Sequence, residues 1–180
     1  MGFWELFSTP QGVAAQCVGF VAMGVAFFIY AFRDRRKILF TKLIADALWM
    51  IHYVLLGAHS GAVINTINVV REGVFYHKEK PWASHLFWPF LFVAANAVST
   101  AFSWQGWISL LPLVGSSLNV LALWCASPKR IRLIALPALT MWEIYSILVG
   151  SVSSTIVNGI SIVSILFAMG RDLLERRKNA

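Results

Sequence analysis

The chain has 180 residues, of which 58% are hydrophobic and only 13% are charged, and its formal net charge at pH 7 is +7. A soluble domain of this size cannot bury so much apolar surface, so the composition predicts a protein whose outer face contacts membrane lipids. Because the basic residues fall in short loops between apolar runs, they indicate membrane topology and argue against a nucleic-acid partner.

Seven apolar segments follow one another along the chain, each bounded by charges, Gly or Pro. A helix of about 20 apolar residues crosses the hydrocarbon core of a bilayer. In chain order the predicted spans are roughly 13–32, 38–57, 60–76, 85–103, 106–126, 131–149 and 152–170. Their connections are short, so consecutive helices are expected to be antiparallel neighbours. The pattern predicts an all-α polytopic membrane protein, with residues 1–180 forming a single membrane domain.

The distribution of the 15 Lys and Arg residues predicts the orientation of these helices. All 15 lie in alternate connections, at the adjoining helix ends or in the C-terminal tail. The connections 57–61, 103–107 and 149–154 carry none. The positive-inside rule therefore predicts that the N-terminus lies outside and that the C-terminus lies in the cytoplasm.

A long segment of the chain occurs twice: residues 49–70 reappear as 142–163, at a constant offset of 93. Eight of the 22 paired positions are identical, namely Trp49/Trp142, Ile51/Ile144, Leu55/Leu148, Gly57/Gly150, Ser60/Ser153, Asn65/Asn158, Ile67/Ile160 and Val70/Val163. The repeat divides the chain into a first unit at about 13–77, a linker helix at about 85–103 and a second unit at about 106–170. Two three-helix units joined by one extra crossing are expected to be parallel, as in some transporters.

Each unit carries a Trp in its second helix and an Asn 16 residues later in its third: Trp49 with Asn65, and Trp142 with Asn158. The tight turn between the helices brings each pair to a similar depth, so the four side chains are predicted to meet near the bundle centre. Asn amides suit hydroxyl-rich or amide-bearing solutes, and indole faces stack on flat rings. Alternatively, the Asn side chains join helices and the Trp side chains fill volume.

Two acids, Asp46 and Glu143, are the only ones predicted well inside the spans. Buried acids in membranes are costly and often functional, so both are candidates for contacting a polar solute or carrying protons. For Asp46 the alternative is a local ion pair with Lys42, one helical turn away. Glu143 has no obvious local partner.

Four further residues complete the candidate set. His52 aligns with Tyr145 at the offset of 93, and both are candidates for the pocket wall or the core. Pro112 and Pro137 are predicted to interrupt the fifth and sixth spans, where they can act as hinges. We find no metal-binding, cofactor-binding or nucleophile motif, so the sequence predicts neither an enzyme nor a bound cofactor.

With its two three-helix units and linker helix, the chain resembles the SWEET sugar-transporter superfamily, which also includes SemiSWEETs, PQ-loop proteins and PnuC-type vitamin transporters. The Trp and Asn pairs resemble the SWEET substrate pocket. Within that superfamily the chain is most similar to the YgjV family of bacterial inner-membrane proteins, chiefly over LLPLVGSSLNVLALWCASPKRIR (110–132) and 142–163. SWEETs have hinge prolines in both units, whereas here only the second unit has them.

The resemblance implies a SWEET-like 3+1+3 fold in a bacterial inner membrane, with a periplasmic N-terminus. The function expected is transport of a small polar solute, sugar-like or vitamin-like, by alternating access. The alternative is a membrane receptor, scaffold or assembly factor that transports nothing. A monomer contains both units, and a homo-oligomer is equally compatible with the sequence.

Overall fold

The computed structural model describes residues 5–29, 35–124 and 128–178. Seven helices of 15 to 27 residues occupy the predicted spans. They are α2 (Pro10–Ile29), α3 (Arg35–Leu55), α4 (His59–Tyr76), α5 (Phe87–Phe102), α6 (Leu110–Trp124), α7 (Pro128–Leu148) and α8 (Val152–Lys178). A short helix, α1 (Glu5–Ser8), precedes them, and a 3-10 turn (Trp107–Ser109) precedes α6. Over the described residues, the predicted all-helical structure is confirmed.

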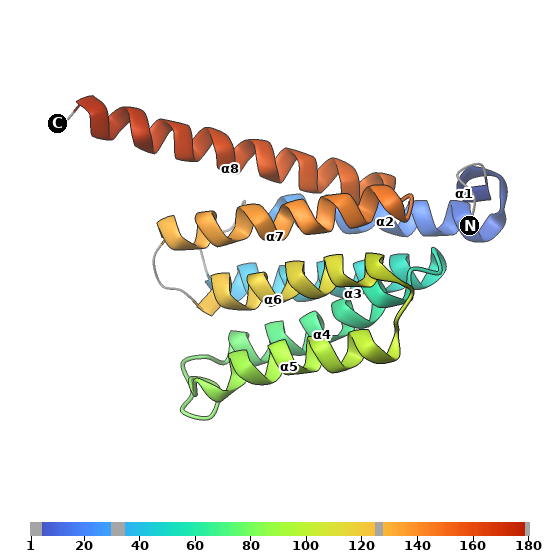
Figure 1. Ribbon diagram of the computed structural model, residues 1–180, viewed down its shortest axis with the longest axis horizontal. Coiled ribbons are helices and arrows are strands. Elements are labelled where there is room, and N and C mark those ends of the chain that lie inside the picture. Colours follow the sequence, from blue (N-terminus) through green and yellow to red (C-terminus); the bar gives the residue numbers. More distant parts are fainter. Residues whose placement is uncertain (1–4, 30–34, 125–127, 179–180) are drawn as a thin grey trace.

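The seven long helices run alternately in opposite directions along one bundle (Figure 1). Consecutive helices pack side by side, α2 also packs against α8, and α4 also packs against α6. Helices α2, α3 and α4 therefore run in the same directions as α6, α7 and α8, and α5 is the additional helix that connects the two units. We call the end with the connections 56–58, 103–109 and 149–151 the turn end. The opposite end, where α3 and α7 begin, is the basic end.

The turn between α3 and α4, at Gly57, and the turn between α7 and α8, at Gly150, have the same backbone geometry. Gly57 and Gly150 both have φ of +71°, a left-handed conformation that favours glycine. One hydrogen bond of a Schellman motif recurs in both turns: Ala58 N donates to Tyr53 O, and Ser151 N donates to Ser146 O, both at 2.9 Å. The duplication seen in the sequence is thus also a duplication of local structure.

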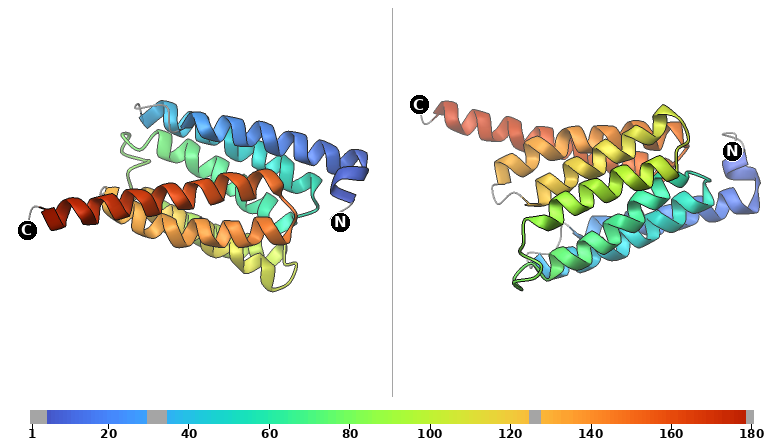
Figure 2. Two further views of the ribbon diagram at one scale, coloured as in Figure 1. Left: turned by 90° about the horizontal axis from the view of Figure 1, so that it is seen from above. Right: turned by 60° about the horizontal axis from the view of Figure 1, so that its bottom comes forward.

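Three features of the helices differ from the prediction: the start of α2, the place of Pro112 and the end of α8. Helix α2 begins at Pro10 because Pro is favoured at the first helical position, and the Thr9 hydroxyl caps the helix by accepting from Gly12 N at 3.1 Å. Pro112 is the third residue of α6, so it lies in the first turn instead of interrupting a helix, whereas Pro137 does lie inside α7. Helix α8 continues to Lys178 and extends past its neighbours (Figure 2).

Three helical segments of the described chain are long and apolar enough to cross a membrane: Pro10–Phe28, Arg36–Leu55 and Trp107–Trp124. The apolar helices Phe87–Phe102, Leu133–Leu148 and Val152–Phe167 are shorter. Helix α4 meets neither description, because its sequence HSGAVINTINVVREGVFY contains adjacent charges and several polar residues. Those polar residues of α4 are nevertheless buried, which directs attention to the interior of the bundle.

Candidate functional site

A cavity of about 170 Å³ lies between the two units. Every long helix except α5 contributes to its wall, which consists of Ala26, Lys42, Ala45, Asp46, Trp49, Tyr53, Asn65, Asn68, Asn119, Leu139, Trp142, Ser154, Val157, Asn158 and Ser161. Ten of these residues form five pairs at the offset of 93, which are Ala26/Asn119, Asp46/Leu139, Trp49/Trp142, Asn65/Asn158 and Asn68/Ser161. The pairs place the cavity on the axis that relates the two units.

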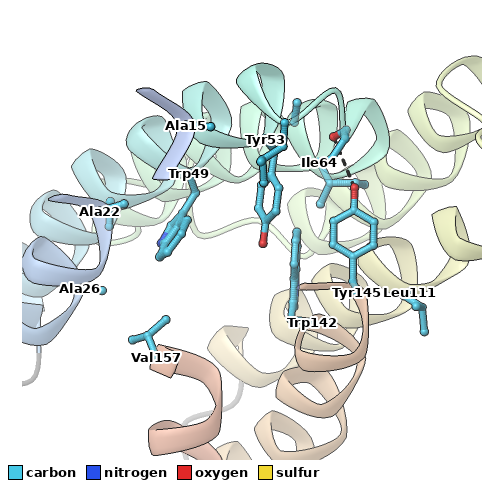
Figure 3. Packing of buried hydrophobic residues seen from close by; sticks show 14 residues of the cluster. Ala15, Ala22, Ala26, Trp49, Tyr53, Ile64, Leu111, Trp142, Tyr145 and Val157 are labelled. Atoms are coloured by element: carbon cyan, nitrogen blue, oxygen red, sulfur yellow. Dashed lines mark hydrogen bonds between the residues drawn. The ribbon is translucent and has the colours of Figure 1, made fainter. Parts of the chain in front are cut away.

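The two predicted Trp and Asn pairs therefore line one cavity, but Tyr53 separates the indoles. Tyr53 lies between Trp49 and Trp142 (Figure 3), with ring centroids at 6.3 Å and 6.0 Å respectively. The sequence did not predict that a third aromatic ring fills the space between the two indoles. A phenol ring occupies that space, and a solute would contact the indole surfaces on the cavity side.

The two Asn side chains make different contacts on either side of the cavity. Asn65 donates to the carbonyl of Gly61, one turn earlier in α4, at 2.9 Å. Asn158 donates to the hydroxyls of Ser154 at 3.3 Å and Ser146 at 3.4 Å. Neither Asn side-chain oxygen accepts a hydrogen bond from the residues that the structure describes. Both oxygens are thus left as acceptors for a solute that carries hydroxyl or N–H donors.

A buried hydroxyl cluster connects Tyr53 to the second unit. The Tyr53 hydroxyl lies 2.9 Å from Ser154 Oγ and 3.3 Å from Ser146 Oγ, and the two serine oxygens are 2.7 Å apart. Ser146 is the residue of the second unit that is equivalent to Tyr53, at the offset of 93. The first unit therefore has a large aromatic side chain where the second has a small hydroxyl side chain. The large side chain of one unit occupies the space left by the small side chain of the other.

His52 and Tyr145, two predicted pocket residues, instead join the units between the cavity and the turn end. The His52 ring nitrogens lie 2.7 Å from Ala15 O and 2.7 Å from Ser151 Oγ of the other unit. The Tyr145 hydroxyl accepts from Gly61 N at 2.8 Å and donates to Ala58 O at 3.3 Å. Ala58 and Ser151 are themselves equivalent positions. The contacts are reciprocal, as expected at an interface between related halves.

Glu143 lies outside the set of residues that line the cavity. Its carboxylate lies beside Gly159 of α8. A β-carbon built onto that glycine would be 3.8 Å from Glu143 Oε1, which is an ordinary van der Waals contact. Its Oε2 atom is buried and has no hydrogen-bond partner among the described residues. The structure therefore places Glu143 between α7 and α8, outside the cavity wall.

Asp46 does line the cavity, and it belongs to a group of four charged side chains, Lys42, Asp46, Arg71 and Glu72, which we call the charged cluster. The Lys42 ammonium lies 3.1 Å from Asp46 Oδ2, which confirms the ion pair considered above. It also lies 3.5 Å from Glu72 Oε1, and that oxygen accepts from Arg71 at 2.8 Å. Arg71 and Glu72 are buried, with 1% and 0% of their side chains exposed.

The burial of Glu72 corrects the expectation that Asp46 and Glu143 are the only acids well inside the bundle. Glu72 lies beside Arg71 near the end of α4, and the equivalent residue of the second unit is Ile165, so the repeat did not point to it. Tyr53, Asn68, Asn119 and Ser154 were likewise not among the predicted site residues. The available signal was the shared face of α3, since Tyr53 follows Trp49 by one turn.

Within the described residues, no group of three or more His, Cys, Asp or Glu side chains is arranged to hold a metal ion. The chemistry of the cavity is therefore that of aromatic faces, amides, hydroxyls and one ion pair. Such a wall can bind a small polar molecule by stacking and hydrogen bonding.

Comparison with known proteins agrees with an inner-membrane location. The model of a family described as bacterial inner membrane protein, Imp-YgjV, matches residues 13–176. Inner membrane protein YgjV of Escherichia coli (strain K12) is 23% identical over 145 residues, which cover 81% of this chain and 76% of that protein. No solved structure matches the chain. Since the family model covers most of the chain, the protein belongs to the Imp-YgjV family of bacterial inner membrane proteins.

Proposed function

We propose that the protein is a transporter that moves a small polar solute, sugar-like or vitamin-like, across the inner membrane by alternating access. The observation that carries the proposal is the cavity at the axis between the two units, lined by five equivalent residue pairs. A site between two repeated bundles can open to either side when the bundles rock against each other. A packed scaffold needs no such cavity.

In this proposal the seven long helices span the membrane in a SWEET-like 3+1+3 arrangement. The turn end faces the periplasm with the N-terminus, and the basic end faces the cytoplasm with the C-terminus. The position of Lys78 and Lys80 in the α4–α5 connection, and of Arg36 and Lys37 in the first turn of α3, supports this orientation. Both walls of the cavity come from one chain, so a monomer is sufficient, and no cofactor is required.

The solute would contact the cavity-side surfaces of Trp49 and Trp142 and donate hydrogen bonds to Asn65 and Asn158. Pro137, inside α7, would act as a hinge in the second unit. The polar atoms that face the cavity without partners support a hydroxyl-bearing or N–H-bearing solute.

The first experiment measures thermal stabilisation of the purified protein by a panel of sugars, nucleosides, vitamins and amino acids. The Asn65→Ala/Asn158→Ala variant is measured beside it. Each lost hydrogen bond should weaken binding by about 1–3 kcal/mol, so the stabilisation by an active compound should disappear. Thr66→Ala is a matched control, because Thr66 is next to Asn65, lies outside the cavity wall, and donates its hydroxyl to Ala62 O at 3.0 Å within α4. Unchanged binding and uptake in the double variant would refute the pocket assignment.

The second candidate is a receptor, scaffold or assembly factor that does not transport. The hydrogen bonds of His52 and Tyr145 between the units favour it, because they hold the turn end closed. Labelling of single cysteines placed at 65 and 158, after Cys17 and Cys125 are replaced, distinguishes the candidates. A transporter exposes both positions to water-soluble, membrane-impermeant reagents, whereas a closed scaffold protects both.

A further inference from the structure

The cavity has one charged wall and one uncharged wall. Lys42 and Asp46 both line it in the first unit. The equivalent positions of the second unit, 135 and 139, are Ala and Leu, and Leu139 also lines the cavity. The repeat therefore preserves the aromatic and amide positions but not the charges. A solute bound on the axis between the units would meet a cation and an anion on one side only.

Lys42 has two carboxylate partners, Asp46 and Glu72. Because Glu72 can remain paired with Lys42, Asp46 is able to pair with a cationic group of a solute instead. The ammonium lies 3.1 Å and 3.3 Å from the two Asp46 oxygens and 3.5 Å from Glu72 Oε1. With 27% of its side chain exposed, Lys42 is the most accessible member of the charged cluster. If Asp46 turned toward a bound cation, Lys42 would keep Glu72 as its partner. The Lys42–Asp46 pair can thus open without leaving either side chain unpaired.

The charged cluster is balanced, with two cationic and two anionic side chains. Arg71 and Glu72 are held in place by burial, and Arg71 also donates to Ser116 Oγ at 3.5 Å. Ser116 in turn donates to Asn68, a residue of the cavity wall, at 2.7 Å. In a site of low dielectric constant, adding a singly charged solute would leave one charge uncompensated, which is costly. A solute with one charge of each sign preserves the balance.

From these contacts we propose that the cavity binds a small zwitterion of the α-amino-acid type, with its cationic group on Asp46 and its anionic group on Lys42. The inference rests on the proposed transport of a small polar solute, and it makes that solute an amino acid in place of a sugar-like or vitamin-like compound. The remaining part of the solute would face the indoles and the Asn oxygens. The cavity volume of about 170 Å³ restricts this part to a small group.

The test uses the full-length protein and a series of probes with different charges, in which the uncharged N-acetyl amide also controls for the added bulk of the blocking groups. For proline, alanine and serine, binding is measured for the free amino acid, the amide (a cation), the N-acetyl acid (an anion) and the N-acetyl amide (uncharged). The free amino acid of at least one scaffold should bind about tenfold or more tightly than each of its three relatives, because the charged hydrogen bonds are made together only by the zwitterion.

Two variants then assign the charges. In Asp46→Asn the zwitterion should lose its advantage over the anion, and in Lys42→Met it should lose its advantage over the cation. A purely structural ion pair would change the affinity for all four probes alike. Glu79→Gln is the control, because Glu79 forms an exposed pair with Arg36 at 2.7 Å, away from the cavity, and should leave the preference unchanged. The melting temperature of each variant without probe identifies any loss of folding.

Three outcomes would overturn the inference: no zwitterion of the series binds, the uncharged probe binds as tightly as the zwitterion, or both variants weaken all probes equally. The proposed function fails separately. If a neutral sugar or nucleoside binds and the Asn65→Ala/Asn158→Ala variant loses it, the transport site stands and only the zwitterion inference is refuted. If instead no compound binds and cysteines at 65 and 158 are inaccessible from both sides, both proposals are wrong.

Discussion

At the scale of single residues, Tyr53 decides the shape of the cavity. Its ring lies between the two indoles, and its hydroxyl joins the serine cluster of the second unit. Burial of an aromatic ring supplies most of the energy of such a contact, and its hydroxyl adds a hydrogen bond. The ring and the hydroxyl of Tyr53 therefore have separable effects on stability.

Tyr53→Phe removes the hydroxyl and keeps the ring. We expect a loss of about 0.5–1.5 kcal/mol in the free energy of unfolding, because Ser146 and Ser154 still bond to each other at 2.7 Å. Tyr53→Ala should cost about 3–5 kcal/mol, because it leaves a large cavity. Chemical denaturation in detergent, followed by tryptophan fluorescence, measures both values. Equal losses in the two variants would show that the ring does not pack as described.

Removal of a buried charged side chain should destabilise the protein more than removal of an exposed one. Glu72→Ala removes the partner of buried Arg71, so we expect a loss of about 3–5 kcal/mol in the free energy of unfolding. Glu79→Ala breaks the exposed Arg36 pair and should cost at most about 1 kcal/mol. Thermal unfolding of both variants and of the unmodified protein in the same detergent buffer measures the difference in stability. A small effect of Glu72→Ala would mean that water reaches the charged cluster.

At the scale of helices, glycines show where α2 packs most closely. A side-chain carbon on Gly19 would overlap Ser153 of α8 and lie 2.7 Å from the His52 ring. A carbon on Gly24, in the same helix, would meet nothing within 4 Å. The first glycine permits the close approach of α2 to the other unit, whereas the second has no such steric role.

The two glycines of α2 therefore provide a matched pair of substitutions. Gly19→Ala should destabilise the protein by about 1–3 kcal/mol, because it overpacks the contact with α8. Gly24→Ala should stabilise it by up to about 1 kcal/mol, because alanine favours the helix. Melting temperatures in detergent should move in opposite directions. A shift of the same sign in both variants would contradict the close packing at Gly19.

At the scale of the whole molecule, hydrogen bonds from His52 and Tyr145 join the two units at the turn end. His52 and Tyr145 reach across to the opposite unit there, while Lys42 and Asp46 line the cavity on the basic side. In the proposed orientation, this arrangement closes the cavity toward the periplasm. Opening on that side requires the hydrogen bonds of His52 and Tyr145 to break.

His52→Phe keeps a ring at this position and removes the two 2.7 Å hydrogen bonds. Loss of about 1–3 kcal/mol should raise the population of the periplasm-open state by roughly 5- to 150-fold. A cysteine at 158, in a chain without other cysteines, should then react faster with an impermeant maleimide added to the periplasmic side. His59→Gln, at an exposed position, is the control. An unchanged rate would exclude His52 from the closed side.

The sequence by itself predicted the seven helices, the internal repeat and the two Trp and Asn pairs that line the cavity. These features depend on apolar periodicity and turn residues within short segments, and the repeat copies them from one unit to the other. The left-handed glycines at 57 and 150 illustrate this, since both follow from local turn chemistry.

Tertiary structure alone decided which side chains occupy the interface between the units. Tyr53 between the indoles, the burial of Glu72, the displacement of Glu143 from the cavity, and the reciprocal contacts of His52 and Tyr145 all depend on how each helix is rotated and how closely the units approach. The physical reason is that these positions break the repeat. Once the residues at equivalent positions differ in size and charge, the packing of each depends on its tertiary neighbours, even where, as for His52 and Tyr145, the positions contacted still correspond.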